Sequence, residues 1–273
     1  MIYDFKLLYN ESVFELTRIN FDETKAKAEI DAIFNFCFKG THWNNDRKIL
    51  KRIRCCVRQR KKQKPLAYIL GSEMCYGLEF SVGPGVLIPK PGTDSYVEEA
   101  LKNLEGKKSP VVVDLCSGSG CMGIPIAYHR QDALVYLVEK SRKAFFYLEK
   151  NTQKYSLKNA KPIKADIFKV ESVHNIDLII ANPPYAGEED MKFLPEEMRY
   201  EPRMAFDGGK DGFDFYEKIL KKWLPELKKD GTIILGAARN TDRVLDLLKI
   251  NGLKTNNFLD SYENSMIIVG KFE

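Results

Sequence analysis

The stretch Pro110-Val-Val-Val-Asp-Leu-Cys-Ser-Gly-Ser-Gly-Cys-Met-Gly123 decides the fold, because it reads as a buried strand, a glycine loop and the start of a helix that continues to His129. Its glycines, Gly118, Gly120 and Gly123, permit a tight turn, a close approach of the backbone to a ligand and close packing of the helix. This order predicts a nucleotide-binding crevice at the carboxyl ends of parallel strands. Such a glycine pattern is weak evidence when it stands alone.

Two further strand-like segments, Ala133–Val138 and Lys161–Ala165, each lead into an acidic residue. The first is followed by Glu139, about 20 residues past the loop, where a carboxylate can bind both hydroxyls of a ribose. The second delivers Asp166, which together with Phe168 can hold an adenine by its exocyclic amine and its ring face. These features suit either a nicotinamide cofactor or S-adenosylmethionine.

A third strand-like segment, Ile176–Ala181, runs into the tetrapeptide Asn182-Pro183-Pro184-Tyr185. A planar amide or adenine nitrogen attacks an electrophile only when it is held through its hydrogens. The Asn182 side-chain oxygen and the Pro183 carbonyl are suitable acceptors, the two prolines stiffen the turn, and the Tyr185 ring can cover a planar group. Asn-Pro is also a common turn signal, but a hydride-transfer enzyme has no evident use for this tetrapeptide.

Taken together, Asp114–Gly120, Glu139, Asp166–Phe168 and Asn182–Tyr185 resemble class I S-adenosylmethionine-dependent methyltransferases that act on amino groups. Further segments narrow the resemblance to the release factor glutamine methyltransferases, also called the HemK or PrmC family. These segments are Pro65–Gly71, Val86–Asp94, Glu201–Arg203 and Asp207–Tyr216. The resemblance implies an α/β fold, a Rossmann-like seven-stranded and mainly parallel sheet with an antiparallel C-terminal edge formed by Thr255–Leu259 and Ser265–Lys271.

The resemblance also implies roles for individual residues. The cofactor S-adenosylmethionine is expected to bind at Asp114, Cys116, Ser117, Gly118, Ser119, Gly120, Glu139, Asp166, Phe168 and Asn182. The acceptor is expected to bind at Asn182, Pro183, Pro184 and Tyr185, of which Asn182, Pro183 and Tyr185 are the expected catalytic residues. No metal site is expected, because the six cysteines contain no C-x-x-C pair and the three histidines are scattered.

Several positions depart from the family pattern. Lys90 and Met266 stand where arginine is usual, Gly92 and Gly236 where glutamate is usual, and Cys116 where the first loop glycine is usual. The resemblance implies methyl transfer to a glutamine side chain of a peptide-chain release factor. The alternatives are an adenine amino group of RNA or DNA, another small molecule or peptide for a diverged paralogue, and a cofactor-binding protein without turnover.

At 273 residues the chain has room for two domains. We expect a helical substrate-docking domain at 1–72, with one helix over Asp22–Lys39 that begins at a capping aspartate. A β-hairpin linker is expected at 73–92, with strands at Glu73–Ser81 and Gly83–Ile88. The S-adenosylmethionine-dependent methyltransferase domain is expected at 93–273.

The formal charge of +5 is unevenly distributed. Ten lysines or arginines and no acidic residue lie in Arg47–Lys64, and the rest of the chain carries a net −5. Apolar residues recur through this run at helical spacing, which predicts an amphipathic helix. Its basic face is interpreted as a solvated surface, with docking onto an acidic protein or an RNA-rich partner as the alternative. With no long apolar run and no secretory signal pattern, we expect a cytoplasmic protein that does not enter a membrane.

Overall fold

The computed structural model describes residues 2–19, 22–39, 46–171, 173–238, 240–259 and 266–272. The chain forms two compact units. The first comprises 1–71 together with 195–200, and the second comprises 72–194 and 201–273. None of the described helices is long and apolar enough to cross a lipid bilayer.

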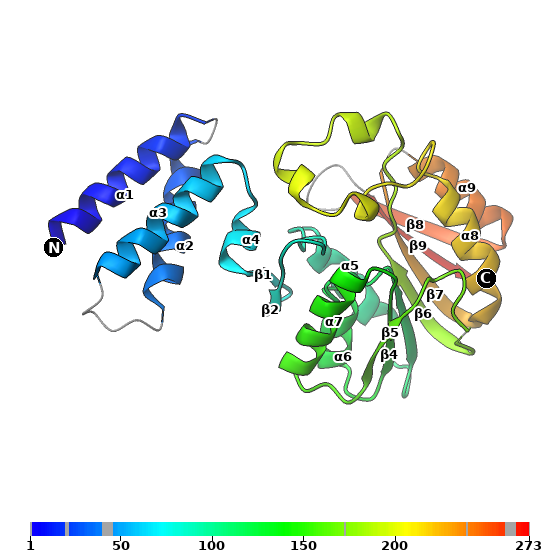
Figure 1. The fold of residues 1–273 in the computed structure, drawn as a ribbon. Coiled ribbons are helices and arrows are strands. Elements are labelled where there is room, and N and C mark those ends of the chain that lie inside the picture. The colour runs from blue at the N-terminus through cyan, green and yellow to red at the C-terminus, as the bar shows by residue number, and fades with distance from the viewer. Residues whose placement is uncertain are drawn as a thin grey trace. The chain divides into compact units, whose positions relative to one another are not determined.

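The first unit is built from helices α1 (Ile2–Thr17), α2 (Glu23–Phe38), α3 (Asp46–Lys61) and the short α4 (Leu66–Leu70) (Figure 1). Asp22 caps α2, because its side chain accepts a hydrogen bond of 2.8 Å from the backbone N–H of Lys25. The expected helix start is therefore confirmed. Apolar residues such as Leu16, Ile30 and Ile53 are fully buried in the core of this unit.

Helix α3 is amphipathic, as its sequence predicts. Ile49, Ile53 and Val57 are buried against the other helices of the unit, whereas Arg54 and Arg58 are exposed. One basic residue of the run behaves differently: Arg60 is only 1% exposed. The 3-10 turn Glu197–Tyr200 belongs to the same unit and supplies one of the contacts of Arg60.

A β-hairpin opens the second unit, formed by β1 (Ser72–Cys75) and β2 (Leu78–Ser81). Tyr76 and Gly77 make the turn, and both have positive φ angles, 46° and 71°. Two-residue turns with this backbone close hairpins because their twist matches that of the strands. The expected strand pair Glu73–Ser81 and Gly83–Ile88 was therefore wrong: the turn comes earlier, and residues 83–88 form a loop.

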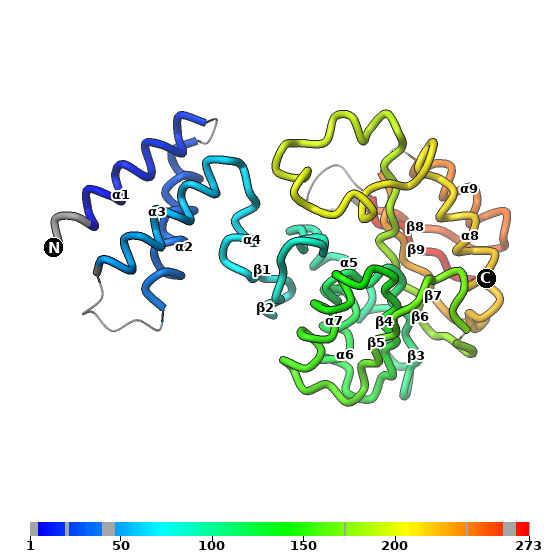
Figure 2. Tube along the Cα trace, in the orientation of Figure 1, coloured from blue at the N-terminus to red at the C-terminus, as the bar shows by residue number. Residues whose placement is uncertain are grey.

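The second unit contains a seven-stranded sheet in the order β5-β4-β3-β6-β7-β9-β8 (Figure 2). The strands are β3 (Val111–Leu115), β4 (Leu134–Glu139), β5 (Ala160–Lys164), β6 (Ile176–Ala181), β7 (Leu227–Ala237), β8 (Leu253–Leu259) and β9 (Met266–Phe272). The first five run parallel, whereas β9 pairs antiparallel with both β7 and β8. This confirms the predicted sheet and its antiparallel edge; Ser265, the expected first residue of the last strand, lies outside the described residues.

Helices cover both faces of this sheet (Figure 1). On one side lie α5 (Thr93–Asn103), α6 (Gly123–His129) and α7 (Arg142–Lys154), and on the other α8 (Asp214–Trp223) and α9 (Thr241–Ile250). Short 3-10 turns at Asp190–Lys192, Arg203–Ala205 and Leu224–Glu226 complete the described elements. After β5 the chain returns past β3 to form β6, so the strand order reverses between β3 and β6. A reversal of this kind opens a crevice at the carboxyl ends of the two strands.

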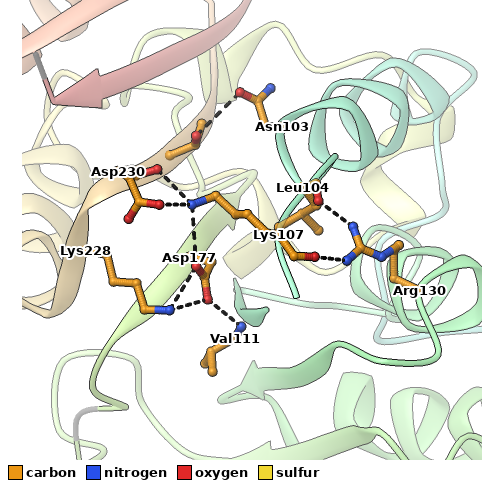
Figure 3. Close-up of polar contacts among 9 residues, drawn as sticks. Asn103, Leu104, Lys107, Val111, Arg130, Asp177, Lys228 and Asp230 are labelled. Carbon is orange, nitrogen blue, oxygen red and sulfur yellow. Dashed lines mark hydrogen bonds and ion pairs between the residues drawn. The ribbon is translucent and has the colours of Figure 1, made fainter. Parts of the chain in front are cut away.

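The opposite, amino ends of the strands are tied together by a polar cluster (Figure 3). Asp177 is 4% exposed and accepts hydrogen bonds from the backbone N–H of Val111 at 2.9 Å and from Lys228 Nζ at 2.9 Å. Lys107 Nζ lies 3.5 Å from the same carboxylate and 2.6 Å from that of Asp230. The buried Asp177 carboxylate is thus paired with two lysines, and its contacts connect the amino ends of β3, β6 and β7.

Candidate active site

A cavity that is partly open to solvent lies at the carboxyl ends of β3, β4 and β6. Its walls come from the loop before α5, the glycine loop, the ends of the strands and the segment 202–205. The lining residues are Gly85, Leu87, Ile88, Pro89, Lys90, Thr93, Tyr96, Cys116, Ser117, Gly118, Ser119, Cys121, Met122, Glu139, Lys140, Ser141, Ala144, Asp166, Ile167, Phe168, Asn182, Pro184, Pro202, Met204, Ala205 and Phe215. Most of the predicted cofactor residues are therefore brought together in one cavity.

The glycine loop owes its path to backbone conformations that side chains rarely adopt. Gly118 and Gly120 have φ angles of 57° and 85°, and Cys116 has a φ of 60°. A Cβ atom on Gly123 would stand 2.2 Å from the side chain of Leu137, so only glycine lets α6 pack onto β4 there. Cys116 thus occupies a left-handed position that favours glycine.

Asp114 lies beneath the loop and does not line the cavity. It is fully buried, and its Oδ2 accepts a 3.0 Å hydrogen bond from the backbone N–H of Gly123 at the start of α6. Among the described residues its Oδ1 has no hydrogen-bond partner. Burial raises the pKa of this carboxyl well above the usual aspartate value. Gly120 also stays outside the lining, and a Cβ atom there would stand 2.6 Å from the Ile124 side chain, so this glycine lets the loop pack closely on α6.

Glu139 ends β4 and is 7% exposed. One carboxylate oxygen accepts the N–H of Gly118 at 2.9 Å and the other accepts the N–H of Ser141 at 2.6 Å. Burial raises the pKa of the Glu139 carboxyl, against the lowering effect of these two bonds. A carboxylate has about four lone-pair sites, so Glu139 retains acceptor capacity toward the cavity.

Asp166 follows β5 on the same side of the sheet. Its Oδ1 accepts the N–H of Phe168 at 3.0 Å, and Lys140 Nζ lies 3.0 Å from its Oδ2. The backbone hydrogen bond and, to a smaller degree, the lysine lower the pKa of this carboxyl. The Phe168 ring packs 5.6 Å from that of Phe215, so an aromatic surface adjoins an ionised carboxylate.

The tetrapeptide after β6 contributes Asn182 and Pro184 to the lining of the cavity, whereas Pro183 and Tyr185 are not among the lining residues. The Asn182 carboxamide oxygen is buried and has no hydrogen-bond partner within the part of the chain that the structure describes. Gly212 packs so closely on this turn that a Cβ atom there would stand 2.1 Å from the carbonyl oxygen of Tyr185. The segment after the tetrapeptide therefore braces it from behind.

Residues to which the sequence interpretation gave no role also line the cavity, among them Lys90, Thr93, Tyr96 and Phe215. Lys90 lies in Val86–Asp94, one of the segments that carry the family resemblance, and this resemblance could have indicated that Lys90 belongs to the site. Tyr96 follows in α5, where one face of the helix is expected to be buried for packing alone. Nothing in the sequence distinguishes a cavity-lining tyrosine from a core tyrosine at that position.

Comparison with known proteins agrees with this geometry. Residues 88–199 match the family described as the methyltransferase small domain. The release factor glutamine methyltransferase of Aquifex aeolicus is 31% identical over 215 residues, which are 78% of this chain and 76% of that protein. The chain belongs to the release factor glutamine methyltransferase family. The protein is thus a methyltransferase, and the cavity at the carboxyl ends of its strands is the candidate active site.

Other relatives in the family are matched over different shares of their length. The release factor glutamine methyltransferase of Thermodesulfovibrio yellowstonii is 35% identical, with 67% of each chain covered. For the enzyme of Geobacter sulfurreducens, 39% identical, the chain spans 57% of its length. A ribosomal protein uL3 glutamine methyltransferase of Bradyrhizobium diazoefficiens is 35% identical over 67% of this chain and 60% of that protein.

Two solved structures share the fold at low sequence identity. The catalytic domain of hMettl16, solved with a 3'UTR hairpin, has a TM-score of 0.61 at 15% identity, with 82% of each chain covered. The 16S rRNA methyltransferase RsmC of T. thermophilus, in complex with AdoMet and guanosine, has a TM-score of 0.52 at 18% identity. The comparison covers 74% of this chain and 50% of RsmC.

Proposed function

We propose that this protein transfers a methyl group from S-adenosylmethionine to the side-chain amide nitrogen of a glutamine in a peptide-chain release factor. The observation that carries the proposal is the Asn182 carboxamide, which lines the cavity while its buried oxygen makes no hydrogen bond within the described chain. A buried acceptor without a partner is costly unless a ligand supplies the donor. An amide N–H of the incoming glutamine is such a donor.

The residues present fit S-adenosylmethionine. Glu139 has spare acceptor capacity for the ribose, Asp166 and Phe168 offer a carboxylate and a ring for the adenine, and the loop 116–119 lies where the methionine end would bind. Asp114 would act indirectly, by holding the loop against α6. The cofactor supplies an electrophilic methyl group when bound, so the protein mainly has to align the acceptor with it.

The acceptor nitrogen would be held at the tetrapeptide. Asn182 and the Pro183 carbonyl would accept its two N–H groups and leave its lone pair aimed along the cavity. Tyr185, whose carbonyl packs on Gly212, would help hold the turn in shape. The names of the relatives support glutamine as the acceptor, with release factors in most of them and ribosomal protein uL3 in one.

The test uses methyl-labelled S-adenosylmethionine with purified release factor, purified ribosomal protein uL3 and total RNA in separate reactions. We expect label on a release-factor glutamine. Asn182→Ala should reduce this transfer at least about a hundredfold while cofactor binding persists. Asn257→Ala on the exposed edge strand is the matched control and should leave transfer unchanged. Label only in RNA would show that the protein methylates a nucleic acid instead, as an adenine amino-methyltransferase would. Label only in uL3 would show that the acceptor protein is uL3 and not a release factor.

A further inference from the structure

A row of positive charges lies along the exposed side of α3. Its members are exposed side chains that follow one another at intervals of four, three and four residues: Arg47, Lys51, Arg54 and Arg58. An α-helix turns by about 100° and rises by about 1.5 Å per residue, so this spacing places all four within an arc of about 60° and over a length of about 16 Å. We call this straight row of cations the basic stripe.

The basic stripe stays in solvent because the opposite side of α3 is buried. Ile49, Ile53 and Val57 pack in the core of the helical unit and are at most 4% exposed. Turning the helix to hide its cations would expose these apolar side chains to water. The helical unit therefore presents the basic stripe to solvent as a consequence of its own packing.

The charge of the basic stripe is not neutralised by the rest of the helical unit. Among the described side chains, none of its four cations forms an ion pair with a carboxylate. Glu11 and Glu15 of α1 line a surface hollow together with Arg54 and Arg58, and Glu15 is already paired with Lys61 at 3.0 Å. The positive charge of the stripe therefore exceeds the negative charge described beside it.

The composition of this surface indicates what kind of partner it fits. Apart from Cys55, the described side chains that α3 exposes are all cationic: Arg47, Lys48, Lys51, Arg52, Arg54, Arg58 and Lys61. Protein partners are bound mainly through apolar and aromatic anchors, which are not among these side chains. Contacts to a phosphate backbone need only cations and hydrogen-bond donors, whereas single-stranded bases need aromatic rings on which to stack. A double-stranded nucleic acid is therefore the partner that fits the stripe.

We propose that the basic stripe binds the phosphate backbone of double-stranded RNA without reading its sequence. The choice of RNA over DNA rests on the proposed function, because a release factor works on the ribosome, which is rich in RNA. None of the described residues that line the candidate active site comes from α3, so RNA binding at the stripe is a property separate from methyl transfer. It holds the enzyme at the RNA-rich particle on which its proposed substrate works.

The test measures the binding of a fluorescently labelled RNA duplex of arbitrary sequence to the full chain, by anisotropy at a series of salt concentrations. If four cations contact phosphates, the logarithm of the affinity should fall with the logarithm of the salt concentration with a slope of about −3.5. Arg54→Gln should make this slope shallower by about 1. The matched control on the same helix is Arg52→Gln, because the Arg52 guanidinium packs 4.2 Å from the centre of the Phe36 ring, and it should leave the slope unchanged.

A second pair of variants separates the basic stripe from the net charge of the protein. Substitution of all four stripe residues by glutamine should weaken RNA binding at low salt at least about a hundredfold. The melting temperature should stay unchanged, since these side chains are exposed. The control removes as many charges from exposed lysines of the second unit and should have little effect: Lys108→Gln, Lys158→Gln, Lys221→Gln and Lys229→Gln. Equal losses in the two variants, or no RNA binding by the wild-type protein, would overturn the proposal.

Two competing ligands test the kind of partner. Tighter binding of polyglutamate than of the RNA duplex would overturn the proposal in favour of an acidic protein. Tighter binding of a DNA duplex of the same length would overturn the choice of RNA. The assay needs neither cofactor nor acceptor, so its result is independent of methyl transfer. If the wild-type protein binds RNA through the stripe but transfers no label to release factor, then the proposed acceptor is wrong and the RNA-binding surface stands.

Discussion

The carboxylate of Glu201 lies 2.8 Å from the ammonium nitrogen of Lys90. The Glu201 side chain is 1% exposed, and its second oxygen accepts the backbone N–H of Ile88 at 2.8 Å. Lys90 and Ile88 both line the cavity, and Pro202, the residue after Glu201, lines it too. This ion pair therefore joins two walls of the candidate active site that are more than a hundred residues apart in the chain.

We expect Lys90→Met to lower the free energy of unfolding by about 2 kcal/mol, because it leaves a buried carboxylate without its cation. S-adenosylmethionine should also bind more weakly, since the two walls are no longer held together. Chemical denaturation and calorimetric titration measure the two effects. Lys102→Met is the control, because the Lys102 side chain is 73% exposed and its pair with Glu99 should contribute little. Equal effects of both variants would contradict this role.

A second buried ion pair holds residues 195–200 in the helical unit. The Arg60 guanidinium contacts Glu29 at 2.5 and 3.0 Å and Glu197 at 3.1 Å. Arg60→Met should cost about 3 kcal/mol of stability, because two carboxylates lose their shared cation. Hydrogen exchange in 195–200 should also become faster.

The control for Arg60 is its neighbour in α3, Lys61, which pairs with Glu15 at 3.0 Å on the surface. Lys61→Met should change stability by less than about 1 kcal/mol. Unchanged exchange in 195–200 in the Arg60 variant would show that this segment is held by other contacts.

The left-handed backbone of Cys116 predicts an unusual response to substitution. Cys116→Gly should be more stable than Cys116→Ala by about 1 kcal/mol, because alanine is strained at a φ of 60° and glycine is not. At Cys55, exposed in the middle of α3, the order should reverse by a similar amount, since glycine weakens a helix. Thermal unfolding of the four variants measures both differences. The same order at both positions would contradict the backbone explanation.

The buried carboxyl of Asp114 predicts a pH dependence of stability. Its folded-state pKa is raised by burial, so the folded protein binds this proton more tightly than the unfolded chain does. The protonated Asp114 carboxyl therefore contributes to the free energy of unfolding. This contribution is complete below the ordinary aspartate pKa and is lost as the pH rises through the folded-state pKa. Asp114→Asn removes this loss, so the stability of the variant relative to wild type should grow from acidic to neutral pH. Urea unfolding across that range measures it, and parallel curves would contradict the expected ionisation.

Much of the fold is predictable because it depends on local pattern. Apart from Asp114, strand β3 is apolar, as expected of a strand buried on both faces, and the spacing of Ile49, Ile53 and Val57 identifies the buried side of a helix. Strand order is different: right-handed crossovers leave several orders open, and the reversal between β3 and β6 is seen only in the structure. The hairpin turn was misplaced because Tyr76 adopts a positive φ, which its residue type does not indicate.

The sequence by itself determined the strand–loop–helix core, the acidic residues at the ends of the strands and the tetrapeptide after β6, since each is written in consecutive residues. Only the tertiary structure decided which of ten basic residues is buried, Arg60, and which helical tyrosine lies beside Asn182, Tyr96. The burial of Arg60 depends on contacts with residues 31 and 137 positions away in the chain. Tyr96, Asn182 and Gly236 come from three separate parts of the chain, which only the fold brings together. Local periodicity specifies which face of an element is buried, whereas the partner that it meets is set by how the whole chain packs.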